Sequence, residues 1–217
     1  MRNLVSIVIA ATLVICLAES AQAQFEPGEF SVRPEVGLGI ANSFGVTFGG
    51  AAMYVMNDRL AFGPAFHFST AGRQWEISGQ NQSFSTKGSN SMTIAGRVYY
   101  LVTPDSDYPW YVNAGFGLVN FGSVSEFEDG NKIIVSVDNQ NQELKIKSAM
   151  KIAVNLGTGT TFPIGNKMNL VIDANSYIGS HGDVKGEIGG QEVDVSELFE
   201  GGAFWILHTT VGLSIPF

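Results

Sequence analysis

Apolar residues alternate with small or polar residues along most of this chain, with the period of two that β-strands produce. Eight stretches carry the alternation, at approximately 30–41, 44–56, 60–70, 91–102, 110–122, 144–164, 168–179 and 203–217. The apolar face of the last stretch reaches the final residue and includes Val211, Leu213, Ile215 and Phe217. None of the eight has helical periodicity, so the pattern predicts an all-β protein.

The connections between these stretches alternate between short and long. Short connections rich in turn-forming residues occupy 57–59, 104–109 and 165–167, and long polar connections occupy 71–90, 123–143 and 180–202. Only the hairpin around Asn42 and Ser43 is short on the side where the long loops fall. This sorting is typical of membrane barrels, whereas a soluble sandwich has no reason to show it. The sequence therefore predicts an eight-stranded antiparallel up-and-down transmembrane β-barrel with short periplasmic turns and longer extracellular loops.

Aromatic residues near the short turns indicate a membrane interface at that end. Trp and Tyr settle at the level of the lipid headgroups, and membrane barrels carry aromatic girdles there. The residues expected in a periplasmic girdle share the apolar face of their strands and are Tyr54, Phe62, Tyr100, Trp110, Phe162 and Phe217. The other face carries mostly Gly, Ala, Ser, Thr and Asn, which suits the narrow interior of an eight-stranded barrel and leaves no open aqueous pore.

The N-terminal segment has the features of a secretory signal peptide. Arg2 precedes an apolar run over 4–18, and the small residues of an A-x-A site follow at 21–23. The run is shorter than the roughly 20 residues that cross a bilayer, so cleavage is favoured over a retained anchor. We expect residues 1–23 to be a cleaved signal peptide and 24–217 to form the barrel domain. The single cysteine, Cys16, would leave with the leader.

The charge balance narrows the choice of partners. The net charge is -8, and nucleic acid binding needs clustered cations that displace counterions, so no nucleic acid partner is expected. No apolar run of about 18 residues lies outside the leader, so we expect no membrane helix in the rest of the chain. Any crossing of a membrane must therefore use strands.

The signal peptide, the eight strands, the alternating loop lengths and the terminal Phe217 resemble the small outer-membrane β-barrel family of the OmpA/OmpX type, over nearly all of 24–217. Members end in a signature of alternating apolar residues and a final Phe that the barrel assembly machinery recognises. The matching residues are Val211, Leu213, Ile215 and Phe217, although a Tyr is common where this chain has Ile215, and Pro216 is unusual. The resemblance implies a location in the outer membrane, contact with its lipid and lipopolysaccharide, and contact with the assembly machinery during biogenesis. A monomer without cofactors is expected.

Four charged residues fall on the inward face, each about five residues from the turn end of its strand: Arg33, Glu35, Arg97 and Asp173. Opposite charges at one level inside a narrow barrel are expected to pair, since an isolated charge would lose its hydration. We therefore predict a salt-bridge plug, with an ion path gated by the same residues as the alternative. Pro34 and Pro64 lie inside strands, where proline interrupts the ladder. A first strand that begins after Pro34 would leave Arg33 in a periplasmic tail.

The stretch FHFSTAG contains a candidate base and nucleophile, His67 and Ser69. It resembles the H-x-S motif of outer-membrane lipid A deacylases over a few residues only, with Thr70 where that family has Asn. Both side chains have lumen parity and no orienting carboxylate is evident nearby, so we expect hydrogen-bonding roles. His67, His181 and His208 lack ligand spacing, and no metal site is expected.

Acidic residues concentrate in the loops 123–143 and 180–202. We expect a solvated surface there, and the functional alternative is contact with surface polysaccharide through bridging cations or with an external partner. Ile133, Val135 and Val137 are expected to prolong the ascending strand beyond the membrane and to offer an edge for β-augmentation.

Four hypotheses follow for the function. The leading one is a non-enzymatic integral outer-membrane protein with a plugged lumen, acting as an envelope component or through its acidic extracellular loops. The others are a narrow channel or transporter for small or hydrophobic solutes, a lipid A-modifying enzyme built around His67 and Ser69, and a secreted barrel that resembles a lipocalin. The sequence names no ligand.

Overall fold

The computed structural model describes residues 26–79, 82–137, 140–147, 149–164, 168–180, 182–198 and 202–217. The predicted signal peptide, residues 1–23, and the short turn at 165–167 lie outside the described residues. No helix in the described ranges has the length and hydropathy needed to cross a membrane.

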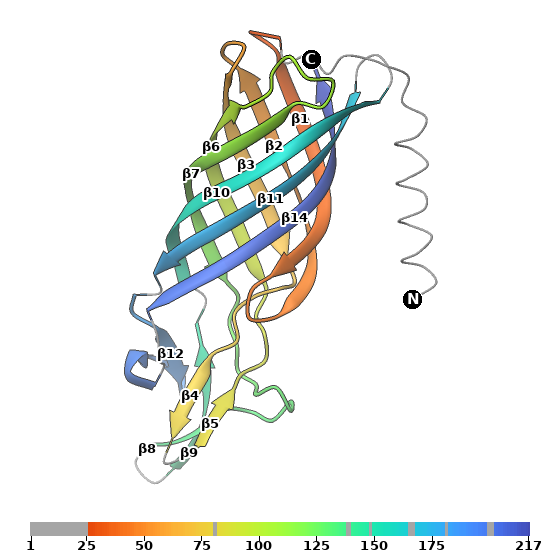
Figure 1. Cartoon of the computed structure of the whole chain (residues 1–217). Coiled ribbons are helices and arrows are strands. Elements are labelled where there is room, and N and C mark those ends of the chain that lie inside the picture. The colour runs from red at the N-terminus through yellow and green to blue at the C-terminus, as the bar shows by residue number, and fades with distance from the viewer. Residues whose placement is uncertain are drawn as a thin grey trace, which may run out of the picture.

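Eight antiparallel strands close into one barrel in the order β1-β14-β11-β10-β7-β6-β3-β2 (Figure 1). Barrel strands that are consecutive in the sequence are neighbours in the barrel. Pairing of the first strand, β1, with the last strand, β14, closes it. The barrel strands are β1 Phe30–Ile40, β2 Phe44–Val55, β3 Leu60–Ser69, β6 Ser91–Leu101, β7 Trp110–Phe121, β10 Ala149–Ile164, β11 Met168–Ser180 and β14 Ala203–Pro216. The predicted eight-stranded up-and-down barrel is confirmed.

One predicted strand differs from the structure. The stretch 144–164 is divided between β10 and a separate strand, β9 (Gln140–Ile146). β9 pairs with strands of the long loops, whereas β10 pairs with its barrel neighbours β7 and β11. The alternation runs through both strands, so the period of two could not reveal that they belong to different sheets.

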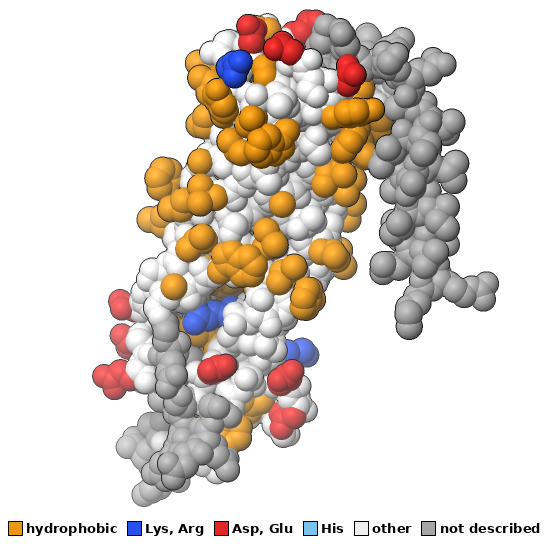
Figure 2. Space-filling model, in the orientation of Figure 1, with side chains coloured by type: hydrophobic (Ala, Val, Ile, Leu, Met, Phe, Trp, Pro, Cys, Tyr) orange, Lys and Arg blue, Asp and Glu red, His pale blue; other side chains and the backbone are white. Residues whose placement is uncertain are grey.

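The barrel is apolar outside, and its interior contains most of the buried polar side chains. On β14, Val211 is 42% exposed and Phe217 is 80% exposed, whereas Thr210 and Ser214 are buried. Because successive side chains of a strand point to opposite faces, the apolar face predicted for each strand lies on the outer wall and the other face fills the interior, called the lumen below. Figure 2 shows hydrophobic side chains over the barrel wall and acidic side chains toward its ends.

Pro34 and Pro64 each interrupt one ladder without ending their strand. Pairing of β1 with β14 skips Arg33 and Pro34, while β1 stays continuously paired with β2. Pro64 leaves a similar gap between β2 and β3, and its pairing with β6 is intact. Proline lacks the amide donor that one of the two neighbouring strands would use. β1 therefore begins at Phe30, and Arg33 lies within it.

The three long loops fold together at one end of the barrel (Figure 1). They contain a hairpin, a four-stranded sheet of order β13-β12-β9-β8 and a short 3-10 helix. The bounds are β4 Glu76–Gly79, β5 Gln82–Ser85, β8 Ile134–Val137, β12 Lys185–Ile188, β13 Gln191–Asp194 and η1 Ser196–Leu198. An isolated bridge between Thr86 and Phe127 connects two of the loops, and a bridge between Glu126 and Lys132 lies within one loop. We call the described residues of 70–90, 122–147 and 182–198 the cap.

The cap has a hydrophobic core of its own, to which all three loops contribute. Its buried residues are Trp75, Val124, Ile133, Leu144, Ile146, Val184 and Val195. The prediction that Ile133, Val135 and Val137 prolong a barrel strand is wrong, because β7 ends at Phe121 and β8 pairs with β9 inside the cap. Ile133 is buried in this core and Val135 packs against it, which a reading of one loop at a time could not show.

Candidate functional site

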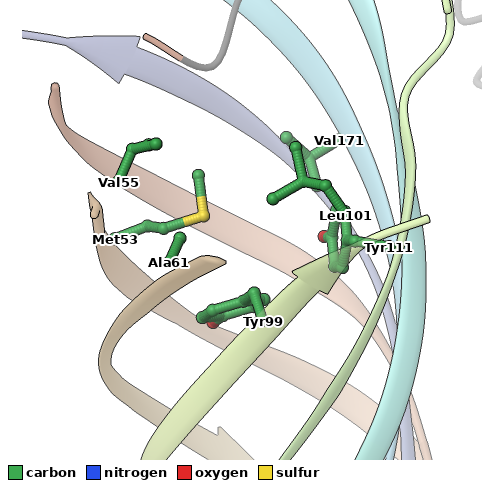
Figure 3. Close-up of a cluster of buried hydrophobic side chains, with 7 residues drawn as sticks. All are labelled: Met53, Val55, Ala61, Tyr99, Leu101, Tyr111 and Val171. Carbon is green, nitrogen blue, oxygen red and sulfur yellow. The ribbon is translucent and has the colours of Figure 1, made fainter. Parts of the chain in front are cut away.

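The lumen is filled in three layers, and the first lies at the end of the short turns. Side chains from the five strands β2, β3, β6, β7 and β11 point into the barrel there and pack together (Figure 3). We call this group the turn-end cluster: Met53, Val55, Ala61, Tyr99, Leu101, Tyr111 and Val171. A second apolar group, the loop-end cluster, lies toward the cap: Ala95, Val119, Phe121, Ala153, Tyr177, Phe204 and Ile206.

Charged and polar side chains lie between the two clusters. On β6, Arg97 comes between Tyr99 of the turn-end cluster and Ala95 of the loop-end cluster. On β11, Asp173 lies in the same way between Val171 and Tyr177. The middle layer contains Arg33, Glu35, Arg97 and Asp173, each at most 5% exposed, together with the buried His67 and His208.

Arg33 is the centre of the charged layer. Its Nη1 lies 3.6 Å from Asp173 Oδ2, and its Nε lies 3.9 Å from Glu35 Oε1. The guanidinium also donates hydrogen bonds of 2.9 Å to the hydroxyls of Tyr99 and Tyr111. Tyr111 in turn donates to Asp173 Oδ1 at 2.7 Å. A buried ion pair needs such additional hydrogen bonds to offset lost hydration.

Glu35 has two further partners in the lumen. Its Oε2 lies 2.7 Å from His67 Nε2 and accepts a hydrogen bond of 3.0 Å from Thr210 Oγ1. The His67 ring meets the His208 ring edge to face, with 5.4 Å between centroids. The carboxylate that orients His67 is therefore Glu35 of β1, and the expectation that none is nearby is wrong. The sequence could not show this contact, because β2 separates β1 from β3, the strand of His67, and the two side chains meet in the lumen.

Arg97 departs from the predicted plug. Among the described residues it forms no ion pair within 4.0 Å, and its Nη2 donates to the Tyr177 hydroxyl. Its backbone pairs with Gly115, and the same row of partners continues through Asn155 to Tyr177. Strand tilt thus brings Arg97 level with Tyr177, which lies nearer the loops than Asp173. Counting residues from the turns on each strand misses this offset.

Two glycines of β10 make room for the polar layer. A Cβ at Gly159 would lie 2.3 Å from Asp173 Oδ1 and 2.5 Å from the Tyr111 hydroxyl. A Cβ at Gly157 would lie 2.2 Å from Asn175 Oδ1. Gly157 and Gly159 therefore have no room for a larger side chain, because side chains from other strands occupy the space in front of them.

His67 and Ser69 do not form a nucleophile and base pair. The Ser69 hydroxyl accepts a hydrogen bond of 3.0 Å from Thr47 Oγ1, and both residues are buried in the lumen. No group of three His, Cys, Asp or Glu residues is arranged to hold a metal ion in the ranges that the structure covers. His181 lies outside them.

The residues of the expected aromatic girdle lie on the outer wall near the short turns. Tyr54, Phe62, Tyr100, Trp110 and Phe217 are exposed there, and Phe162 is half-buried against Tyr108. The residues of the expected assembly signal, Val211, Leu213, Ile215 and Phe217, line the outer face of β14. The backbone amide of Phe217 donates to the Phe30 carbonyl at 2.8 Å, so the last residue takes part in barrel closure.

Ion pairs on the cap connect β12 and β13 to the end of β9. Glu192 accepts hydrogen bonds from Lys185 at 2.9 Å and from Lys147 at 3.0 Å. These two ammonium groups lower the pKa of Glu192 from its usual 4.5 to about 2. The acidic loops predicted from the sequence are thus partly neutralised by neighbouring lysines.

Sequence reasoning missed the tyrosines and the second histidine of the lumen. Tyr99, Tyr111, Tyr177 and His208 all have inward parity, which was the signal available. Parity alone could not show that Tyr99 and Tyr111 are the hydrogen-bond partners of Arg33, because these contacts cross the lumen.

The sequence matches no protein-family model and no curated protein. In fold, the chain is similar to a major outer membrane protein from Thermus thermophilus, with a TM-score of 0.59 and 16% identity over 87% of this chain and 98% of that chain. The outer membrane protein OprG from Pseudomonas aeruginosa gives a TM-score of 0.49 and 12% identity over 90% and 99% of the two chains. The N-terminal β-barrel domain of Pseudomonas aeruginosa OprF gives 0.48 and 11% over 88% and 98%. The likeness to the Thermus protein shows that this chain has the fold of an outer-membrane β-barrel.

Proposed function

We propose that this protein is an integral β-barrel of the outer membrane that does not conduct solutes, has no enzymatic activity and acts at the cell surface through its cap. The outer wall supports the membrane location, because it presents mainly apolar side chains and the closed barrel leaves no strand edge in hydrocarbon. The alternative of a soluble lipocalin-like barrel would need the opposite arrangement, with the apolar side chains inside.

The filled lumen is the observation that carries the non-conducting role. Apolar clusters lie on both sides of the charged layer, and large side chains such as Arg33, Tyr99, Tyr111 and Tyr177 are at most 1% exposed. An eight-stranded barrel has room for its own side chains and little else. Ions would have to cross two apolar layers and displace Arg33 from its partners.

The cap supports a role outside the barrel. It has its own hydrophobic core and sheet, whereas loops that only connect strands need neither. Ordered loops on a rigid barrel are where binding residues are usually placed. We further propose that Val211, Leu213, Ile215 and Phe217 act as the assembly signal, that lipid and lipopolysaccharide surround the barrel, and that the protein is a monomer after cleavage of residues 1–23.

Solute flux through liposomes tests the closed lumen. Liposomes that contain the refolded protein should not swell in isosmotic solutions of small sugars, and planar bilayers should show no unitary conductance. Liposomes with an open porin provide the positive control. Conductance that disappears in Arg97→Ala would instead support a gated ion path.

Two measurements in cells test the remaining parts of the proposal. The protein should fractionate with the outer membrane and migrate differently on gels before and after boiling. Overproduction should leave the mass of lipid A unchanged, since Ser69 and His67 are buried and do not pair with each other. A mass change that disappears in Ser69→Ala would contradict the non-enzymatic role.

A further inference from the structure

One edge of the cap sheet is open. β8 is the last strand in the order β13-β12-β9-β8, and among the strands that the structure describes it pairs only with β9. Figure 1 shows β8 at the end of the cap that lies away from the barrel. We call the side of β8 that faces away from β9 the β8 edge.

The register shows which backbone groups lie on the β8 edge. The Leu144 amide donates to the Ile133 carbonyl at 2.8 Å, so the backbone groups of Ile133 point toward β9. Backbone groups of successive residues point to opposite sides of a strand. Val135 therefore also faces β9, while Ile134 and Ser136 face away from it. Within the described part of the chain, no backbone group outside the ladder bonds to these two residues. The β8 edge thus presents two donors and two acceptors to a new strand.

The composition of β8 favours pairing with another chain. Natural edge strands usually carry charged residues, prolines or bulges that prevent such pairing. β13, at the opposite edge of the same sheet, contains Glu192 and Asp194, whereas β8 contains neither a charged residue nor a proline. Ile134 of β8 is 52% exposed. The two edges of the sheet therefore differ, and only β13 has charged residues that protect it.

An added strand would extend the hydrophobic core of the cap. Ile133 is buried in that core, and Val135 packs against it while remaining partly exposed. Side chains on the same face of neighbouring strands contact each other. Apolar residues at every second position of an added strand would therefore lie against Val135. The β8 edge fits an extended segment in which apolar residues alternate with polar ones.

The hairpin that leads into β8, residues 125–132, has an excess of negative charge. It contains Glu126, Glu128 and Asp129, and its one cation, Lys132, already pairs with Glu126 and with Glu143 of β9. Glu128 and Asp129 are exposed, and neither forms an ion pair within 4.0 Å with another described residue. A partner with basic residues would complement these carboxylates.

We propose that the cap binds an extended segment of another protein by β-augmentation, with backbone hydrogen bonds to Ile134 and Ser136 at the β8 edge. The segment would carry apolar residues at alternate positions and a basic residue near Glu128 and Asp129. In this mode of recognition the backbone bonds supply affinity and the alternate side chains supply specificity. The inference rests on the proposed function, because it names the class of partner that the cap takes.

Fluorescence anisotropy with a labelled peptide tests the proposal. The full chain is refolded in octyl-tetraoxyethylene micelles, the probe peptide is Lys-Val-Thr-Val-Thr-Val-Lys, and empty micelles give the background. The wild-type protein should bind the probe. It should bind the same peptide with Glu in place of both Lys at least about tenfold more weakly, because attraction to the hairpin becomes repulsion. Absence of binding, or equal affinity for the two peptides, would overturn the proposal.

Two variants of one residue locate the site. Ser136→Pro removes an amide donor of the β8 edge and keeps the bonds of β8 to β9, so it should weaken binding by about tenfold or more. Ser136→Ala is the matched control, since it keeps the amide and should bind as the wild type does. Hydrogen exchange of residues 140–146 verifies that the cap sheet is intact. Wild-type affinity in Ser136→Pro with an intact sheet would refute the β8 edge.

Peptides with methylated backbone amides test the same point without changing the protein. One peptide carries N-methyl groups on the three valines and the other carries them on the two threonines. In an added strand the amides of one set point to β8 and those of the other set point to solvent. One peptide should therefore lose binding while the other keeps it. Similar affinity of both peptides would exclude backbone pairing at an edge.

Intact cells separate this inference from the proposed function. If the probe binds the purified protein but not cells that overproduce it, the cap does not act at the cell surface, while the β8 edge is still supported. Liposome flux does not involve β8, so a leaking barrel would refute the closed lumen alone.

Discussion

Arg33 and Asp173 meet inside the barrel although β14 separates their strands. Arg33 Nη1 lies 3.6 Å from Asp173 Oδ2, and both side chains are 1% exposed. The ion pair therefore connects β1 to β11 through the lumen, while the ladders connect the same strands around the wall. This cross-connection makes the contents of the lumen part of what holds the barrel closed.

Arg33→Met should strongly destabilise the barrel. It would leave Glu35 and Asp173 buried without their cation, and breaking a buried pair in this way costs about 3–5 kcal/mol. Urea unfolding in lipid vesicles, followed by tryptophan fluorescence, measures the loss. Lys132→Met removes only exposed ion pairs, those with Glu126 and Glu143, and should leave the free energy of unfolding nearly unchanged. Equal effects of the two changes would contradict a stabilising role for the charged layer.

Tyr111→Phe should destabilise the barrel by about 1–3 kcal/mol, because it removes the acceptor of Arg33 and the donor to Asp173 within a buried network. Tyr100→Phe is the control, since the Tyr100 hydroxyl accepts from Arg59 on the exposed outer wall. The same urea titration compares the two variants, and a larger loss in Tyr100→Phe would count against the network.

Gly159→Ala should destabilise the barrel by about 1–3 kcal/mol, because the new methyl group overlaps Asp173 and Tyr111 and overpacking carries a cost of this size. Gly96→Ala is the matched control, since a Cβ at Gly96 would meet no atom of the described residues within 4 Å. Thermal unfolding of the two variants in the same detergent makes the comparison. If Gly159→Ala is as stable as Gly96→Ala, Asp173 and Tyr111 do not fill the space in front of Gly159.

Acid should loosen β12 and β13 of the cap. The hydrogen bonds from Lys185 and Lys147 lower the pKa of Glu192 to about 2, so the folded cap favours the ionised carboxylate. This stabilisation is present above the ordinary pKa of 4.5 and is lost as the pH falls from 4.5 through 2. Hydrogen exchange of residues 185–194 at about pH 6 and pH 3 measures it, after correction for the intrinsic rate. In Glu192→Gln this pH dependence should be weaker, and an unchanged dependence would exclude Glu192 as its source.

Phe217→Ala should separate recognition during assembly from stability. The Phe217 side chain is 80% exposed, and its backbone bond to Phe30 is kept in the variant. We therefore expect normal folding into liposomes but less assembled protein in the outer membrane of cells, measured by the unboiled band on gels. Trp205→Ala, at the opposite end of the same outer face, is the control. Equal losses in cells for both variants would contradict an assembly signal in the last strand.

The sequence by itself determined the eight barrel strands and the face on which each side chain lies. Successive side chains of a strand point to opposite faces, and the apolar face of a membrane barrel contacts lipid. Val211 and Phe217 were therefore expected outside and Thr210 inside. The same rule placed Arg33, Glu35, Arg97 and Asp173 in the lumen, because each is fixed by local parity.

Only the tertiary structure decided which of these side chains meet. Strand tilt and register bring Arg97 to Tyr177 and leave both carboxylates to Arg33, and no single strand contains that information. The cap was hidden for a related reason. Its core takes Trp75, Leu144 and Val195 from three different loops, and its short strands carry too few residues for a periodic signal, so only their packing against one another in space defines it.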